Sequence, residues 1–269
     1  MQNFQSIFKV DKPIVGMIHL KALPGTPKFN DNINKIIDTA LNEVEIYKNA
    51  HIDGLAIENM HDVPYLKNDV GHEISSLMSI IAYEVKKLSR LPCGIQVLSS
   101  ANKAALAIAK NANLDFIRAE GFVFGHVADE GYIDANAGEL LRYRKTINAE
   151  HIAVFTDIKK KHSSHTLTSD VDIVETAKAA EYFLSDGLII TGISTGESAN
   201  MDEINAIKKA CKIPVIVGSG ITIDNVTEYL SSSDALIVGS YFKKDGFWTN
   251  ALEQDKIARF MDKVNSQRR

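Results

Sequence analysis

Cysteine is scarce in this sequence, and the two that occur are far apart. Among 269 residues only Cys93 and Cys211 are cysteines, and neither belongs to a C-x-x-C pair or a histidine-rich run. Disulfide frameworks and structural zinc sites depend on such spacings. The sequence therefore predicts neither of them, and we expect two buried free thiols.

Long apolar runs and an excess of basic residues are also missing. No hydrophobic run approaches the roughly 20 residues that cross a bilayer, and residues 1–10 lack the apolar core of a signal peptide. The net charge is −4, whereas proteins that bind nucleic-acid backbones usually carry a basic surplus. The sequence favours a cytoplasmic protein with no transmembrane segment and no nucleic-acid partner.

The chain does contain a repeated alternation of short apolar runs and helical periodicity. The apolar runs predict eight strands, at Ile14–Leu20, Gly54–Asn59, Gly94–Leu98, Asp115–Glu120, His151–Ile158, Gly187–Thr191, Pro214–Gly218 and Ala235–Gly239. Helical periodicity follows each run, near Ile33–Asn49, Glu73–Ser89, Ala101–Asn111, Gly138–Thr146, Val171–Leu184, Met201–Cys211, Ile223–Leu230 and Asn250–Val264. Eight such units predict an α/β chain folded as a (β/α)8 TIM barrel, with residues 1–269 forming a single domain.

A doubly wound open sheet is the main alternative fold because it shares this alternation. Such a sheet usually has fewer strands and a glycine-rich turn after the first one. The first predicted turn here is Lys21-Ala22-Leu23-Pro24-Gly25-Thr26-Pro27. Proline and glycine at these positions suit a stiff turn or a lid, but they do not form a dinucleotide-binding motif.

Two of the predicted strands end in Gly-Ser, which suggests a phosphate site. The seventh runs into Gly218-Ser219-Gly220 and the eighth into Gly239-Ser240. Glycine lets backbone N–H groups approach a ligand closely, and the loops after strands seven and eight commonly bind phosphate in barrels. We expect these residues to hold a phosphate, with Lys243 as a further side-chain donor.

A glycine-rich turn follows the sixth predicted strand. It begins at Thr191-Gly192 and continues to Gly196. Loops at this end of a barrel often bind ligands, but they can equally be flexible connections. The sequence leaves both interpretations open for Thr191 and Gly192.

Side-chain alternation along the strands predicts a ring of polar groups at one rim of the barrel. Alternate residues of a strand face the same side, so His19, Glu58 and Arg118 are expected to point inward. On strand five the same parity places Asp157 and Lys159 inward. An internal salt-bridge network, such as Arg118 with Glu58 or Glu120, would explain the same ring, but so many converging charges favour a site.

The segment after strand five is unusually basic. It reads Lys159-Lys160-Lys161-His162-Ser163-Ser164-His165. Short charge runs are often solvated loops, and the sequence leaves open whether Lys160 and Lys161 belong to such a loop or to a site. Lys159 and His162 are better candidates for catalytic residues, because the loops at the carboxyl ends of barrel strands carry catalytic side chains. The two histidines could bind a metal, but no third ligand is evident, so no metal or other cofactor is predicted.

These residues suggest chemical roles. Asp157 and Glu58 are candidate general bases, and Arg118 could neutralise an oxyanion or a carboxylate. Lys159, if desolvated, could form a Schiff base as in lyases and aldolases. His19 could be a catalytic base or an ordinary buried histidine. An isomerase would need only an acid and a base, so the reaction type stays open.

The chain resembles the BtpA/SgcQ family. The resemblance rests on motifs that run in order along nearly the whole sequence: Gly16-Met17-Ile18-His19-Leu20, Leu23-Pro24-Gly25, Asp53-Gly54, Glu58-Asn59, Asp62-Val63-Pro64, Phe116-Ile117-Arg118, Asp129-Glu130-Gly131, Leu140-Leu141-Arg142-Tyr143-Arg144, Asp157 to His162, Thr191-Gly192 with Thr195-Gly196, Gly218-Ser219-Gly220, and Val238-Gly239-Ser240 with Lys243-Lys244-Asp245-Gly246. This resemblance implies a TIM barrel like the phosphate-binding barrels.

The family resemblance implies two different functions. SgcQ-like members lie among carbohydrate-metabolism genes and look like enzymes, whereas the cyanobacterial namesake is associated with accumulation of photosystem I proteins. This chain departs from the namesake at Gln96, at Ser99-Ser100 and in its Lys-Lys-Lys-His run, which looks like the SgcQ-like branch. The leading hypothesis is an enzyme acting on a small phosphorylated metabolite, as a homo-oligomer. The alternative is a non-catalytic assembly factor that binds a protein or a metabolite.

Overall fold

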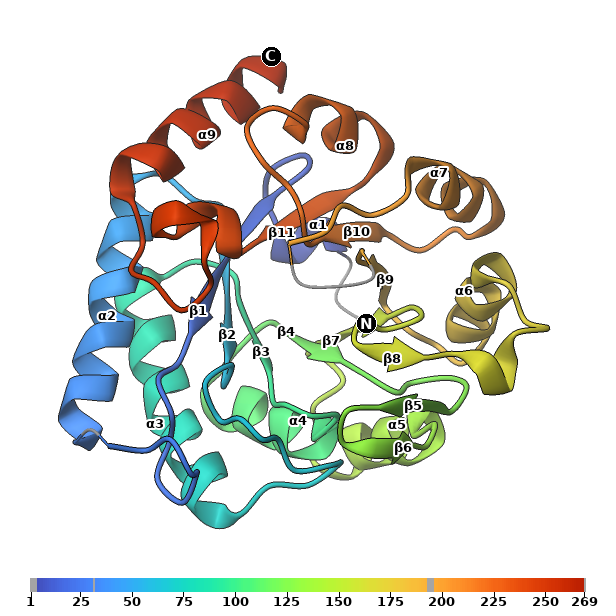
Figure 1. Ribbon diagram of the computed structural model, residues 1–269, viewed down its shortest axis with the longest axis horizontal. Helices are drawn as coiled ribbons and strands as arrows, with labels where there is room; N and C mark the ends of the chain where they lie inside the picture. The colour runs from blue at the N-terminus through green and yellow to red at the C-terminus, as the bar shows by residue number, and fades with distance from the viewer. Residues whose placement is uncertain (1–3, 31, 193–195, 269) are drawn as a thin grey trace.

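The predicted barrel is confirmed in a computed structural model that describes residues 4–30, 32–192 and 196–268. Within these residues, eight parallel strands close on themselves (Figure 1). In order around the barrel they are β1 (Ile14–His19), β11 (Ala235–Val238), β10 (Val215–Gly218), β9 (Gly187–Ile190), β7 (Ala153–Asp157), β4 (Phe116–Ala119), β3 (Cys93–Gln96) and β2 (Gly54–Glu58). Because β1 pairs with both β2 and β11, no barrel edge is left open.

A ring of helices surrounds the strands (Figure 1). These helices are α2 (Ile33–Asn49), α3 (His72–Ser89), α4 (Asn102–Asn111), α5 (Ala137–Thr146), α6 (Ile173–Tyr182), α7 (Met201–Ala210), α8 (Val226–Ser232) and α9 (Gln254–Gln267). Side-chain caps fix some of their starts: Asn32 accepts from the Lys35 amide at 2.7 Å, and Asp172 accepts from the Glu175 amide at 2.8 Å. None of the described helices is long and apolar enough to cross a membrane.

The barrel interior is apolar at its amino end and polar at its carboxyl end. Val15, Met17, Phe116 and Phe155 belong to a buried inner cluster, in which the two phenylalanine rings lie 5.2 Å apart. Helix α1 (Phe4–Ile7) belongs to the same cluster, so it closes the amino end of the barrel. The next inward positions along the strands are polar, as the side-chain alternation predicted.

Several short elements lie outside the predicted alternation. A small antiparallel sheet has the order β6 (Gly131–Ile133), β5 (His126–Ala128) and β8 (Ser163–Ser164), and it joins the loop after β4 to the loop after β7. The 3-10 turns η1 (Thr166–Thr168), η2 (Ser240–Phe242) and η3 (Lys244–Gly246) are similarly short. Elements of two or three residues carry too little periodicity to be predicted from sequence.

Candidate functional site

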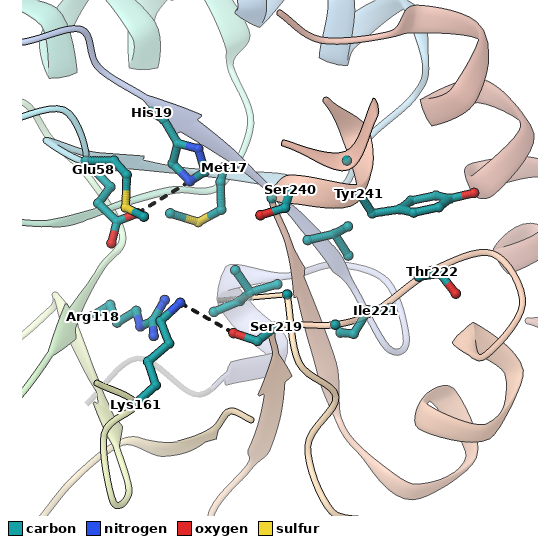
Figure 2. A pocket seen from close by; sticks show the side chains of 17 residues that line it. Met17, His19, Glu58, Arg118, Lys161, Ser219, Ile221, Thr222, Ser240 and Tyr241 are labelled. Carbon is teal, nitrogen blue, oxygen red and sulfur yellow. Dashed lines mark hydrogen bonds and ion pairs between the residues drawn. The ribbon is translucent and has the colours of Figure 1, made fainter. Parts of the chain in front are cut away.

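A pocket at the carboxyl end of the barrel brings the two Gly-Ser segments together. We call this cavity of about 170 Å³ the Gly-Ser pocket. It is lined on one side by Ser219, Gly220, Gly239 and Ser240, and Gly218 is the last residue of β10 directly before them. On the other side it is lined by His19, Glu58, Arg118 and Lys161 (Figure 2). The Gly-Ser segments after β10 and β11, the seventh and eighth barrel strands along the chain, thus face a set of ionisable side chains.

Backbone geometry explains the glycine at position 220. Its φ is +64°, and a Cβ there would lie 2.4 Å from the Ser198 amide nitrogen. Any larger residue would be strained and would collide with backbone atoms. At Gly239 a Cβ would lie 3.2 Å from the His19 ring. Close approach of backbone to the pocket therefore depends on the absence of side chains here.

Lys243 does not reach this pocket, which corrects its predicted place in the phosphate site. Its side chain is buried behind the barrel, where Nζ donates to the Glu43 carboxylate of α2. Burial lowers the pKa of Lys243, and the charge of Glu43 partly offsets this effect. Ser240 and Tyr241 of η2 line the pocket, but the side chain of Lys243, which follows them, reaches α2 instead.

The turn after β9 contributes to the pocket at its far end. Gly196 lines the Gly-Ser pocket, whereas Thr191 and Gly192 are not among its lining residues. A Cβ on Gly192 would lie 2.2 Å from the Glu197 carbonyl oxygen, so close packing within the turn accounts for this glycine. Residues 193–195, which include Thr195 of the family motif, lie outside the described residues.

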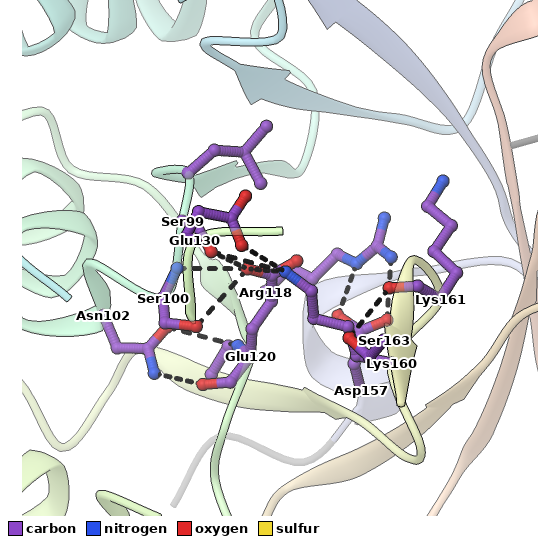
Figure 3. A network of polar contacts seen from close by, with 12 residues as sticks. Ser99, Ser100, Asn102, Arg118, Glu120, Glu130, Asp157, Lys160, Lys161 and Ser163 are labelled. Carbon is purple, nitrogen blue, oxygen red and sulfur yellow. Dashed lines mark hydrogen bonds and ion pairs between the residues drawn. The ribbon is translucent and has the colours of Figure 1, made fainter. Parts of the chain in front are cut away.

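Arg118 and Asp157 form a buried bidentate ion pair between β4 and β7. Nε of Arg118 donates to Asp157 Oδ2 at 2.8 Å, and Nη2 donates to Oδ1 at 2.7 Å (Figure 3). Burial acts to lower the pKa of Arg118, but the Asp157 charge holds it above its usual value. The sequence suggested Glu58 or Glu120 as the partner of Arg118, and it is Asp157. Since both oxygens of Asp157 already accept hydrogen bonds, this carboxylate orients Arg118.

His19 and Glu58 meet on neighbouring strands at the rim. His19 Nε2 lies 3.4 Å from Glu58 Oε2, and both side chains are buried. Burial, with the charge of Lys243, lowers the pKa of His19 well below its usual value. Burial also raises the pKa of Glu58, and the charge of Arg118 only partly offsets this. The pair therefore combines a neutral imidazole with a carboxyl group suited to proton transfer.

Strand β7 ends at Asp157, which changes the expected role of the basic segment. Lys159 has a φ of 47°, so strand parity no longer applies to it. Its Nζ donates to the Val171 carbonyl at 2.6 Å, outside the Gly-Ser pocket. Lys161 lines the pocket instead, with Nζ 3.4 Å from Ser219 Oγ (Figure 2). Burial, with the charge of Arg118, lowers the pKa of Lys161.

Lys160 is also buried, so of the two interpretations that the sequence left open for it, the solvated loop is wrong. Its Nζ lies 3.3 Å from Glu120 Oε2 and 3.8 Å from Glu130 Oε2 (Figure 3). Glu120 Oε2 also accepts from the Ser100 amide at 3.0 Å. This network joins β4 to the loop between β5 and β6.

A second cavity of about 320 Å³ adjoins the Gly-Ser pocket, and we call it the Trp248 pocket. The two cavities share Glu58, Met60, Arg118 and Lys161. His162 lines the Trp248 pocket, so the structure brings this predicted residue to the same mouth.

The described residues contain no group of three or more His, Cys, Asp or Glu side chains arranged to hold a metal ion. His165 Nε2 lies 3.0 Å from the Lys160 carbonyl oxygen, and its ring packs 5.4 Å from that of His126. Its position is thus explained by contacts within the protein.

Sequence reasoning missed Lys161 and the Lys160 network. Lys159 and His162 both have positive φ, so the regular strand alternation does not continue through this segment. Glycine would have signalled positive φ, but none occurs in this segment. The basic run itself was the only available signal.

Comparison with known proteins is consistent with this architecture. A protein of Caenorhabditis elegans whose name places it in mitochondria is 47% identical over 264 residues, covering 96% of this chain and 95% of its own. The photosystem I biogenesis protein BtpA of Synechocystis is 31% identical over 263 residues, covering 97% and 91%. The solved orotidine 5'-monophosphate decarboxylase of Methanocaldococcus jannaschii superposes with a TM-score of 0.61 at 16% identity, covering 95% and 99%. This last likeness concerns the fold alone.

The sequence model of the BtpA family matches residues 10–266. That range includes the barrel strands and every residue that lines the Gly-Ser pocket. The chain therefore belongs to the BtpA family.

Proposed function

We propose that this protein is an enzyme acting on a small phosphorylated metabolite. The observation that carries the proposal is the Gly-Ser pocket, where both Gly-Ser segments face Glu58, Arg118 and Lys161. Backbone N–H groups and a nearby cation are suited to a phosphate. The opposing ionisable groups are suited to proton transfer or to covalent chemistry on the rest of the substrate.

The roles of the side chains follow from their contacts. Glu58 serves as the acid or base, because its buried carboxyl has a raised pKa and it lines both cavities. Arg118, oriented by Asp157, stabilises negative charge that develops on the substrate. Lys161 lines the pocket. Its lowered pKa favours the neutral amine that attacks a carbonyl, whereas in its protonated form it would bind a phosphate. A lyase of the aldolase type and an isomerase both use such a set.

The fold supports a phosphorylated substrate by analogy. The decarboxylase with a similar barrel is named for a 5'-monophosphate substrate, and barrels often bind phosphate with the loops after strands seven and eight. We further propose that the protein works in the cytoplasm as a homo-oligomer, whereas the nematode relative is named as mitochondrial. Light scattering coupled to size-exclusion chromatography tests the oligomer.

A non-catalytic assembly factor is the second candidate function. The name of the Synechocystis relative supports it, and so does an exposed apolar patch at the end of α6, where Tyr182, Phe183 and Leu184 are 83%, 47% and 60% exposed. Exposed patches of this kind can bind partner proteins. The nematode relative is the more similar of the two, and animals have no photosystem, so family membership alone does not imply that role.

Thermal-shift titration with inorganic phosphate and with phosphate esters tests the enzyme proposal. Binding to the native state should raise the melting temperature by mass action, and Gly220→Ala should abolish the rise. Replacing Tyr182 by serine should leave it unchanged, because that side chain lies on the outer face. If no phosphorylated compound shifts the melting temperature of the wild type, the enzyme proposal is wrong and the assembly role gains support.

A further inference from the structure

The Trp248 pocket lies next to the Gly-Ser pocket, and the two cavities share part of their lining. Glu58, Met60, Arg118 and Lys161 line both cavities. A molecule whose phosphate lies at the Gly-Ser segments can therefore extend past Glu58 and Lys161 into the second cavity. At about 320 Å³, that cavity is large enough for a small ring, since ligand pockets begin at roughly 300 Å³.

The charges of the Trp248 pocket do not suit a second anion. Among the described residues that line it, the carboxylates of Glu58, Glu120, Asp129 and Glu130 outnumber the cations. Lys160 already pairs with Glu120 and Glu130, and Arg118 pairs with Asp157. The third cation of the lining, Lys161, lies 3.4 Å from Ser219 Oγ at the Gly-Ser pocket. Because two of the three cations are paired within the protein and the third lies beside the Gly-Ser segment, the rest of the cavity favours a neutral or cationic group.

Two buried acceptors in this pocket lack hydrogen-bond donors. Gln96 is 2% exposed, and its Oε1 has no partner among the described residues. One oxygen of Glu130 likewise accepts no hydrogen bond from them, with only Lys160 at 3.8 Å. A buried acceptor left unpaired costs about 1–3 kcal/mol. A ligand that presents O–H or N–H groups would satisfy both.

The remaining wall of the cavity is apolar and partly aromatic. Trp248, Tyr65 and Leu98 form it. The Trp248 ring packs against His61 with centroids 4.7 Å apart, and the Tyr65 hydroxyl donates to the Met60 carbonyl at 2.7 Å, so both rings are held in place. Aromatic side chains and unpaired acceptors in the lining of one cavity match a ligand ring with C–H groups on its faces and hydroxyl or amino groups at its edge.

We infer that the Trp248 pocket binds the hydroxylated ring of a sugar phosphate or an amino-sugar phosphate, with Gln96 and Glu130 as acceptors and Trp248 as the stacking face. This inference rests on the proposed phosphate site but concerns the other end of the substrate. It assigns the selection of the substrate to residues that do not touch the phosphate.

Calorimetric titration can separate binding of the phosphate from binding of the ring. The ligands are inorganic phosphate, phenyl phosphate, ribose 5-phosphate, glucose 6-phosphate and glucosamine 6-phosphate. At least one sugar phosphate should bind about tenfold more tightly than inorganic phosphate and phenyl phosphate, which corresponds to about 1.4 kcal/mol. Gln96→Met, which keeps the size of the side chain, and Trp248→Leu should each remove most of this preference while leaving affinity for inorganic phosphate unchanged.

The exposed Gln254 at the start of α9 provides the matched control, and Gln254→Met should change nothing. The inference is overturned if phenyl phosphate binds as tightly as the best sugar phosphate, or if both pocket variants keep the preference. If inorganic phosphate does not bind but sugar phosphates bind in a Gln96-dependent way, the phosphate site is wrong and the Trp248 pocket stands. If nothing binds, both are wrong.

Discussion

The two sides of the barrel mouth are built by different means. On the side of β10 and β11, backbone atoms with glycine at Gly220 and Gly239 shape the pocket. On the side of β2 to β7, buried charged side chains do so, and each is fixed by a partner such as Asp157 for Arg118. The first side is sensitive to added atoms, and the second is sensitive to lost partners.

This difference decides how each side tolerates substitution. Backbone amides keep their hydrogen-bonding capacity whatever side chain precedes them, provided that the chain can follow the same path. A buried charge, in contrast, is stable only while its counter-charge and hydrogen bonds remain. Substitutions on the two sides should therefore differ in their effects on stability and on binding.

Removing Arg118 should have the largest effect on stability. Arg118→Met leaves Asp157 buried without its bidentate partner, which should lower the free energy of unfolding by about 3–5 kcal/mol. Urea denaturation followed by circular dichroism measures this loss. Lys208→Met is the control, because the Lys208–Asp234 pair is about one-third exposed and should cost below about 1 kcal/mol. Similar losses in both variants would contradict the claim that burial makes the Arg118 and Asp157 side chains depend on each other.

Gly220→Ala should be the most damaging change on the backbone side. A residue held at φ +64° is strained, and the new methyl would meet backbone atoms 2.4 Å away. We expect a loss of about 1–3 kcal/mol in stability and loss of phosphate binding. At Gly131 φ is +98° but nothing lies within 4 Å of an added Cβ, so Gly131→Ala should be milder and should keep phosphate affinity. A Gly220 variant with normal affinity would show that backbone approach does not shape the site.

Lys161→Met should weaken phosphate binding without weakening the fold. Loss of one charged donor should cost about 1.5–3 kcal/mol of binding free energy, measured by calorimetry. Stability should stay equal or rise, because burial disfavours the charged amine. Lys159→Met is a matched control, since Lys159 donates to the Val171 carbonyl away from the pocket. If Lys159→Met weakened binding and Lys161→Met did not, the assignment of the amine would be reversed.

Glu58→Gln should have the smallest effect, and one that depends on pH. Its folded pKa is raised above the unfolded value of about 4.3. The wild type therefore has its full stability below that value and loses some as pH rises through the folded pKa. Over this pH range the free energy of unfolding of the variant should rise by on the order of 1 kcal/mol relative to that of the wild type. The melting temperatures of the two proteins should therefore move apart as pH rises.

Glu139→Gln is the control, because the pH dependence of stability at Glu139 should have the opposite sign. Its pKa is lowered by the Lys103 side chain, which donates to it at 2.7 Å. The wild-type carboxylate should add stability above the unfolded value and lose it as pH falls through the folded pKa. Glu139→Gln should therefore be less stable than wild type at neutral pH. The same sign for both variants would show that burial does not govern Glu58.

Particular residues show how far the sequence could predict the site. His19, Glu58 and Arg118 were expected to point inward, and they do, because each lies in or at the end of a regular strand where alternation is strict. The same rule failed at Lys159, since β7 ends two residues earlier. Lys243 was expected beside the phosphate, but η2 carries it to Glu43.

The sequence by itself determined the barrel, the positions of its strands and the Gly-Ser segments at the ends of β10 and β11. These features depend on local periodicity and on the conformational freedom of glycine, both of which act within a few residues. Only the tertiary structure decided that Asp157 partners Arg118, that Lys161 lines the pocket, and that Gln96 and Trp248 share a second cavity. Such pairings join residues far apart in the chain, and their geometry depends on the path of whole loops rather than on any local pattern.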